Sequence, residues 1–269
     1  MGRRSLPVIL TALLVSAVSA SLHAQAGEPP PEPAGLAWGG EEMRTSFCVH
    51  FLIDPALSGL LPFGGVPLAT AAQATEIHPA LKNVIAGSAE YGSWIPSSLC
   101  LYQYGVLTSP SGTVTDRSDP QGFLVWSAPA AAPGPAPAEV WVTNGRLARQ
   151  SSQPQVRFGR FDLERSPIPE TTKEQLELKV GKTLITWQGR MGADSTAVGA
   201  PAEAAWLLAG SQGSTWTASA RFGMRSERPM IGALRVEGKG ELARILGASP
   251  IRFAGPIRLG GEGAVTFSR

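Results

Sequence analysis

Histidine and cysteine are scarce in this sequence of 269 residues, which holds three of the first and two of the second. Metal centres and the Ser-His-Asp and Cys-His catalytic sites depend on these residue types. The patterns G-x-S-x-G, G-x-x-x-x-G-K-[ST], S-x-x-K and H-E-x-x-H are missing, as is a G-x-G-x-x-G between a strand and a helix. The sequence therefore gives no support to the common nucleophilic, nucleotide-binding or zinc-protease chemistries, and we predict no cofactor.

Charge is also sparse, because charged residues make up 16% of the chain and the formal net charge is +2. A field this weak does not predict a nucleic-acid partner. The charge is unevenly divided: residues 27–150 carry five Lys/Arg and ten Asp/Glu, whereas residues 151–269 carry 16 and 11. An acidic β-rich part over 41–150 and a basic antiparallel β part over 151–269 would explain this division, as two sub-domains or as one continuous domain.

Long uninterrupted helical patterns are missing, since 31 glycines and 23 prolines break up the chain. Short strands joined by turns fit this composition, and we predict an all-β or mostly β fold. Its antiparallel sheets would be sandwich-like or barrel-like, with one or two short helices, near 79–86 and 241–246. The expected strands lie near residues 44–53, 98–107, 122–127, 139–143, 155–163, 204–209, 214–222, 230–237, 250–259 and 264–268.

The amino-terminal 26 residues have the pattern of a secretory signal peptide. Arg3 and Arg4 precede an apolar run over 6–20, and Ala24-Gln25-Ala26 supplies small residues at a cleavage site. The run is shorter than the roughly 20 residues that span a bilayer. We therefore expect an exported protein, periplasmic or extracellular, with no membrane span after cleavage, which leaves peripheral membrane association open. Residues 27–40 are expected to form a disordered tether.

The two cysteines, Cys48 and Cys100, both lie in strand-like runs. Disulfides persist in exported proteins, and two cysteines allow a single intramolecular pairing. There is no C-x-x-C pattern, so we favour a structural disulfide over a redox or metal site. Alternation in the first run places Cys48 and His50 on the face opposite Phe47, Val49 and Phe51.

The strongest local pattern is a hairpin over 176–187. A turn at Gly181-Lys182 would pair Val180 with Thr183, Leu178 with Ile185 and Leu176 with Trp187, all on one face. In the run 156–163 the apolar alternation slips by one residue at Gly159, which predicts a bulge. The proline-rich stretch 128–137 is interpreted as the tip of a hairpin rather than as a domain linker.

Catalytic and metal-binding candidates are weak. A zinc site could be drawn from His50, Glu76 and His78, but Pro79 favours a helix start with His78 as a cap, so we predict no metal site. Paired carboxylates could serve a glycosidase, although these acids have simpler roles on the surface or in turns. The available acids are Asp54, Glu76, Glu90, Asp116 and Asp119.

Candidate binding residues come from the tryptophans and arginines. Trp126 and Trp141 flank the proline loop and are the tryptophans most suited to a partner-facing surface. Arg221, Arg225 and Arg258 are candidates for a basic face. We expect a non-catalytic, exported β-rich protein that binds another protein or cell-envelope component as an accessory or assembly part. The alternative is a secreted hydrolase acting on carbohydrate through paired carboxylates.

Overall fold

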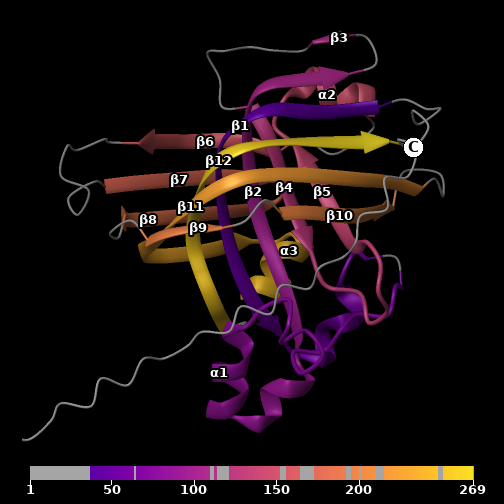
Figure 1. Cartoon of the computed structure of the whole chain (residues 1–269), viewed down its shortest axis with the longest axis vertical. Helices are drawn as coiled ribbons and strands as arrows, with labels where there is room; N and C mark the ends of the chain where they lie inside the picture. Colours follow the sequence, from indigo (N-terminus) through magenta and orange to yellow (C-terminus); the bar gives the residue numbers. More distant parts are fainter. Residues whose placement is uncertain are drawn as a thin grey trace, which may run out of the picture. The chain divides into compact units, whose positions relative to one another are not determined.

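The structure of the chain is a computed structural model (Figure 1). The structure describes residues 37–63, 65–109, 112–113, 121–151, 156–163, 173–191, 195–199, 202–209, 215–247 and 251–268. In chain order the elements are β1 (Ala37–Ile53), η1 (Pro55–Leu60), α1 (Ala80–Gly87), η2 (Ala89–Ser93), β2 (Ile95–Ser109), β3 (Gly112–Thr113), β4 (Gln121–Ser127), β5 (Ala136–Val142), α2 (Gly145–Ser151), β6 (Val156–Leu163), β7 (Lys173–Val180), β8 (Thr183–Met191), β9 (Ser195–Gly199), β10 (Ala202–Ala209), β11 (Thr215–Gly238), α3 (Glu241–Gly247) and β12 (Ile251–Ser268). The predicted mostly β fold with short helices is confirmed.

Seven strands of the described chain form a closed ring, in the order β10, β5, β4, β2, β1, β12 and β11. The ring closes because β10 pairs with β5 on one side and with β11 on the other. The β10–β5 pairing is parallel, whereas the other pairings around the ring are antiparallel. Four consecutive strands of the acidic part (β5, β4, β2 and β1) and three of the basic part (β12, β11 and β10) therefore close one ring, and all described residues belong to one compact unit, Pro33–Arg269.

The ring is filled by one hydrophobic cluster, here called the inner cluster, to which each of the seven strands contributes. Its largest members are aromatic, and α2 adds Leu147 and Ala148. The amide groups at the start of α2 donate to the side chain of Asn144, a cap that explains why this unpredicted helix begins there. The aromatic residues of the inner cluster are Tyr102, Tyr104, Phe123, Trp206 and Phe267.

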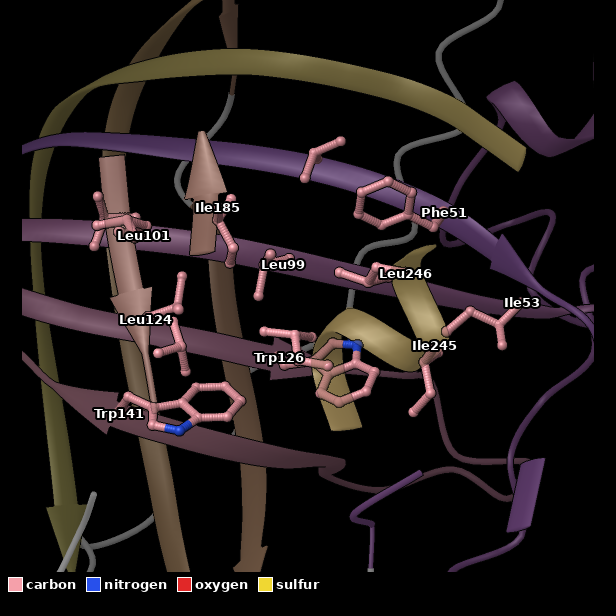
Figure 2. Packing of buried hydrophobic residues seen from close by; sticks show 14 of the residues in the cluster. Phe51, Ile53, Leu99, Leu101, Leu124, Trp126, Trp141, Ile185, Ile245 and Leu246 are labelled. Atoms are coloured by element: carbon pink, nitrogen blue, oxygen red, sulfur yellow. The ribbon is translucent and has the colours of Figure 1, made fainter. Parts of the chain in front are cut away.

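The long strand β11 leaves the ring and continues into a second sheet, where it pairs with β8, followed by β7 and β6. This sheet and α3 cover the outside of β1, β2, β4 and β5 through a second hydrophobic cluster, the outer cluster (Figure 2). Strands such as β4 are thus buried on both faces, because Phe123 and Val125 belong to the inner cluster and Leu124 and Trp126 to the outer one. This two-sided burial accounts for their uninterrupted apolar sequences.

The predicted local elements are largely confirmed. Strand β7 pairs with β8 in the expected register, Leu176↔Trp187, Leu178↔Ile185 and Val180↔Thr183, and all six side chains are buried. The β6–β7 register shifts between Phe158 and Arg160, which confirms the bulge at Gly159. β4 and β5 pair antiparallel on either side of the proline-rich stretch, so the hairpin interpretation is also right. Both predicted short helices are present as α1 and α3.

Other expectations were wrong at their boundaries. The expected strands 214–222 and 230–237 are one strand, β11, and 250–259 and 264–268 are one strand, β12. Residues 37–40, expected in the disordered tether, begin β1 because all four pair with β12, and Gly39 and Gly40 also pair with β2. The predicted signal peptide and residues 27–36 lie outside the described residues. Among the described residues, no helix is long and apolar enough to cross a membrane.

Candidate functional site

The disulfide lies inside the ring. Cys48 and Cys100 are directly opposite each other on β1 and β2, and they form the predicted bond with their side chains in the inner cluster. Their exposed fractions are 4% and 6%. Burial of both sulfur atoms among apolar side chains fits a structural bond rather than a redox site. A buried disulfide also indicates that the protein folds in an oxidising, exported environment.

A polar row lies two residues further along the same strands. His50 is opposite Ser98 on β2, and Ser98 is opposite Ser127 on β4. The Nδ1 atom of His50 is 2.7 Å from the Ser98 hydroxyl oxygen, within hydrogen-bond distance. On the other side of β1, the pairing with β12 shifts both before and after His50. Such bulges redirect side chains, and they recur beside functional sites.

His78 approaches His50 from the segment that leads into α1. Its backbone is fixed on both sides: its amide donates to the carbonyl oxygen of Ala74, and its carbonyl oxygen accepts from the amide of Leu81. Ala74 and Leu81 are fully buried together with Leu52 of β1, in a third cluster between this segment and the ring. The His50 and His78 ring centroids are consequently 5.1 Å apart, at an interplanar angle of 51°.

This position corrects the expectation that His78 caps α1. The residue at the start of that helix is Pro79, and no side chain forms a cap hydrogen bond there. Proline suits the beginning of a helix without such a bond because it has no amide hydrogen to satisfy. The imidazole of His78 instead packs against that of His50.

Burial keeps both imidazoles neutral. Burial, with a smaller contribution from the neighbouring His78, lowers the pKa of His50 to about 4. Burial also lowers the pKa of His78. Neutral imidazole is the form that accepts hydrogen bonds and binds metals. We call His50, His78 and Ser98 the histidine site.

The Ser98–His50 contact is not arranged for nucleophilic catalysis. Ser98 lies near the beginning of β2 and is paired with β1 on one side and with β4 on the other. A serine nucleophile requires backbone amides aimed at the reacting oxygen, commonly from a sharp turn after a strand. A residue whose strand is paired on both sides does not provide that geometry. Within the described ranges, no group of three or more His, Cys, Asp or Glu could hold a metal ion.

The two candidate tryptophans are in the core, so the expectation of a partner-facing position is wrong. Trp126 and Trp141 are 1% and 7% exposed and belong to the outer cluster (Figure 2). The Trp126 indole N–H donates to the Ser97 hydroxyl at 2.6 Å. Both residues point outward from the ring, but the second sheet and α3 cover that face.

The candidate arginines are positioned along one ladder. β11 places Arg221 opposite Ala264, Arg225 opposite Gly261 and Arg228 opposite Arg258 on β12. Arg221 is exposed, and its Nε atom is 3.5 Å from a carboxylate oxygen of Glu203 on β10. The side chains of Arg225 and Arg258 lie outside the described part of the structure.

The carboxylates considered for a glycosidase have local roles where they are described. Asp54 accepts the amide of Ala56 at the start of η1, and Glu76 forms an exposed ion pair of 2.9 Å with Lys82. Glu90 is exposed in the first turn of η2. Asp116 and Asp119 lie outside the described residues. These positions give the hydrolase alternative no support.

Comparison with known proteins identifies no relative: no family, no curated protein and no solved structure matches this chain. The functional interpretation therefore rests on the residues themselves. Sequence reasoning missed Ser98 as a partner of His50. Its position two residues before Cys100 was the available signal, because the predicted disulfide sets the register of β1 on β2 and places 98 opposite 50.

Proposed function

We propose that this protein is an exported, non-catalytic binding or assembly part of a cell-envelope structure, periplasmic or extracellular. The observation that carries the proposal is the filled ring. Phe123 and Phe267 of the inner cluster pack with their ring centroids 5.1 Å apart, and both are fully buried. A ligand cannot enter space occupied by core side chains, so a partner would be recognised on the outer surface.

The charge distribution supports recognition of a protein or another envelope component. Ion pairs on exposed surfaces contribute little to stability, but they steer encounter and select partners. Arg221, Arg225 and Arg258 follow the β11–β12 ladder of the ring, whereas Lys179, Lys182 and Lys239 lie on the second sheet and its junction with α3. Substitutions in the arginine set can therefore be compared with substitutions in the lysine set, which lies on a different part of the structure.

The test is charge reversal on each set. One variant carries Glu at positions 221, 225 and 258, and the matched control carries Glu at 179, 182 and 239, so both change the net charge equally. The native assembly is measured by native gel electrophoresis and by crosslinking with mass spectrometry in the cells that produce the protein. We expect the first variant to lose its assembly while remaining folded and disulfide-bonded, and the control to keep it.

Salt provides an independent measurement on the wild-type protein. Exposed charges are screened beyond about 8 Å at physiological ionic strength, so the assembly should weaken as salt rises. An assembly that survives both reversals and high salt would contradict recognition through charge. A wild-type protein that is monomeric in its native compartment, without any crosslinked partner, would contradict the proposal itself.

A further inference from the structure

We propose that the outer edge of β6 is an interface for a second copy of this chain, paired antiparallel across a two-fold axis so that the second sheet continues through both copies. Among the described strands, β6 pairs with β7 alone and ends the order β11, β8, β7, β6 (Figure 1). The edge of a sheet presents backbone N–H and C=O groups with which another strand can pair. The inference does not rest on the function proposed above, because β7 and β8 separate this edge from β11 and its arginines.

The bulge at Gly159 determines which positions of β6 share a face of the sheet. Apolar positions on both sides of the bulge lie opposite buried residues that alternate along β7. The pairs are Val156↔Val180, Phe158↔Leu178 and Phe161↔Leu176. Residues directly opposite each other share a face, so these β6 positions all belong to the face that the β7 residues bury. Without the extra residue, the positions before and after the bulge would fall on opposite faces.

Because of this bulge, the sequence of β6 is complementary to itself in one antiparallel register. The two-fold axis of that register passes between Gly159 and Arg160. The pairs between the two copies are Val156↔Leu163, Phe158↔Phe161 and Arg157↔Asp162. The axis repeats each pair, and the apolar pairs all fall on one face of the continuous sheet. Apolar pairs and pairs of opposite charge directly across antiparallel strands are stabilising.

The charged positions of β6 select this register. A shift of one residue places Arg157 opposite Phe161 or Leu163, which belong to the other face. Within one copy, Arg157 lies opposite Lys179 of β7, and like charges directly opposite each other are destabilising. Asp162 of a second copy, on the other side of Arg157, would offset this repulsion. Charges and a bulge protect an edge against indiscriminate pairing, so this edge accepts its own copy in preference to other strands.

The test is the oligomeric state of the purified, disulfide-bonded chain. Sedimentation equilibrium is measured over protein concentrations from about 1 μM to 1 mM. We expect a reversible monomer–dimer equilibrium that stops at the dimer, because a two-fold interface is closed. Arg157→Glu and Asp162→Arg each place like charges opposite each other at both ends of the interface. Each variant should therefore raise the dissociation constant of its own dimer by about tenfold or more.

Mixing the two variants tests the register itself. Positions 157 and 162 are both acidic in the Arg157→Glu copy and both basic in the Asp162→Arg copy, so a mixed dimer regains opposite charges at both ends. We expect the equimolar mixture to form dimers that neither variant forms alone, and the double variant to form dimers by itself. Within one copy, the two changes lie opposite Lys179 and Gln175, so neither brings like charges together. The matched control is Arg235→Glu, an exposed position of β11 on the same sheet, which should leave the dissociation constant unchanged.

Circular dichroism and thermal unfolding verify that each variant is folded before its dissociation constant is interpreted. A wild-type chain that stays monomeric at the highest concentration would overturn the proposal, including the case in which a strand of another protein occupies the edge. A dimer that Arg157→Glu, Asp162→Arg and Arg235→Glu weaken equally would place the interface elsewhere and overturn it as well. Folded single variants that lose the dimer and do not recover it on mixing would contradict the two-fold register of β6.

Discussion

Two buried tryptophans of the outer cluster differ in one hydrogen bond. Trp126 and Trp187 are each 1% exposed, and the Trp126 indole donates to Ser97. For the Trp187 indole N–H, the described residues provide no hydrogen-bond partner. A buried unpaired donor costs free energy that a paired one does not.

Replacement of each tryptophan by phenylalanine should separate these effects. Both changes leave a similar cavity, but Trp126→Phe also loses a hydrogen bond, whereas Trp187→Phe removes an unpaired donor. We expect Trp126→Phe to lower the free energy of unfolding by about 1 kcal/mol more than Trp187→Phe, measured by denaturant titration. Equal losses would show that the bond to Ser97 contributes nothing.

Among the described acidic residues, Glu139 on β5 has the pKa that lies furthest from its ordinary value. Burial, with a smaller contribution from Glu241 at the start of α3, raises the pKa of its carboxyl from an ordinary value of 4.5 to about 7. Glu139 lies opposite Trp126, on the face that the outer cluster covers. Its ionised form is therefore disfavoured in the folded protein.

The consequence for stability has a definite sign. Below pH 4.5 both the folded and the unfolded protein hold this proton, and between pH 4.5 and 7 only the folded protein does. The contribution of Glu139 to the free energy of unfolding therefore decreases as the pH rises through this window, and it is constant above the window. Glu139→Gln should match the wild type near pH 4.5 and exceed its melting temperature at pH 8. Glu241→Gln, at an exposed position, is the control and should have the smaller effect.

At the scale of elements, the β7–β8 hairpin depends on one backbone conformation. Gly181 has a φ of +57°, in the left-handed region that favours glycine. Gly181→Ala should lower the free energy of unfolding by about 1 kcal/mol, and Gly181→Asn by less, because asparagine tolerates this region better. Gly87→Ala is the control: a Cβ added at this helical position would meet no other atom, so no loss is expected. An equal loss at both positions would contradict the argument.

The same hairpin shows which parts of the fold can be predicted from sequence. Its turn, register and buried face all follow from alternation within twelve residues, and the bulge at Gly159 follows from a slip in alternation. Such features are local. The short helices α1 and α3 are local too, because proline and glycine mark their ends.

Closure of the ring was not predictable in this way. The pairing of Trp206 on β10 with Ala136 on β5 is parallel and joins distant parts of the chain. Alternation of apolar and polar residues shows which side chains share a face of a strand, but it does not show which strands are neighbours in the sheet. The same limit explains why the burial of Trp126 was not predicted. The apolar run Phe123–Trp126 indicates that the strand is buried on both faces, but the sequence does not show that the second sheet covers the outer face.

The candidate site also has a part that local sequence patterns predict and a part that they do not. The shared face of Cys48 and His50 followed from strand alternation, and the disulfide then set the partner strand. The approach of His78 depends on how the segment before α1 packs against Leu52, which is a tertiary contact. A histidine before a proline gives no local signal of that contact.

For the whole molecule, the disulfide joins two strands that other strands hold on both sides. β1 lies between β2 and β12, and β2 lies between β1 and β4. The bond therefore adds nothing to the topology of the folded ring, and its stabilisation comes chiefly from restricting the unfolded chain. Cys48 and Cys100 are 52 residues apart, which corresponds to about 4 kcal/mol in the chain-entropy model.

A Cys48→Ala/Cys100→Ala double variant tests this account of the ring. It should keep the β-sheet circular dichroism spectrum of the wild type but lose about 4 kcal/mol of unfolding free energy. The wild type measured in reductant should lose a similar amount, because both conditions release the same loop. Mass spectrometry after alkylation verifies the bond in protein from its native compartment. If the double variant unfolded at the same denaturant concentration as the wild type, the neighbouring pairings alone would hold β1 and β2 in place, and the ring would need no covalent constraint.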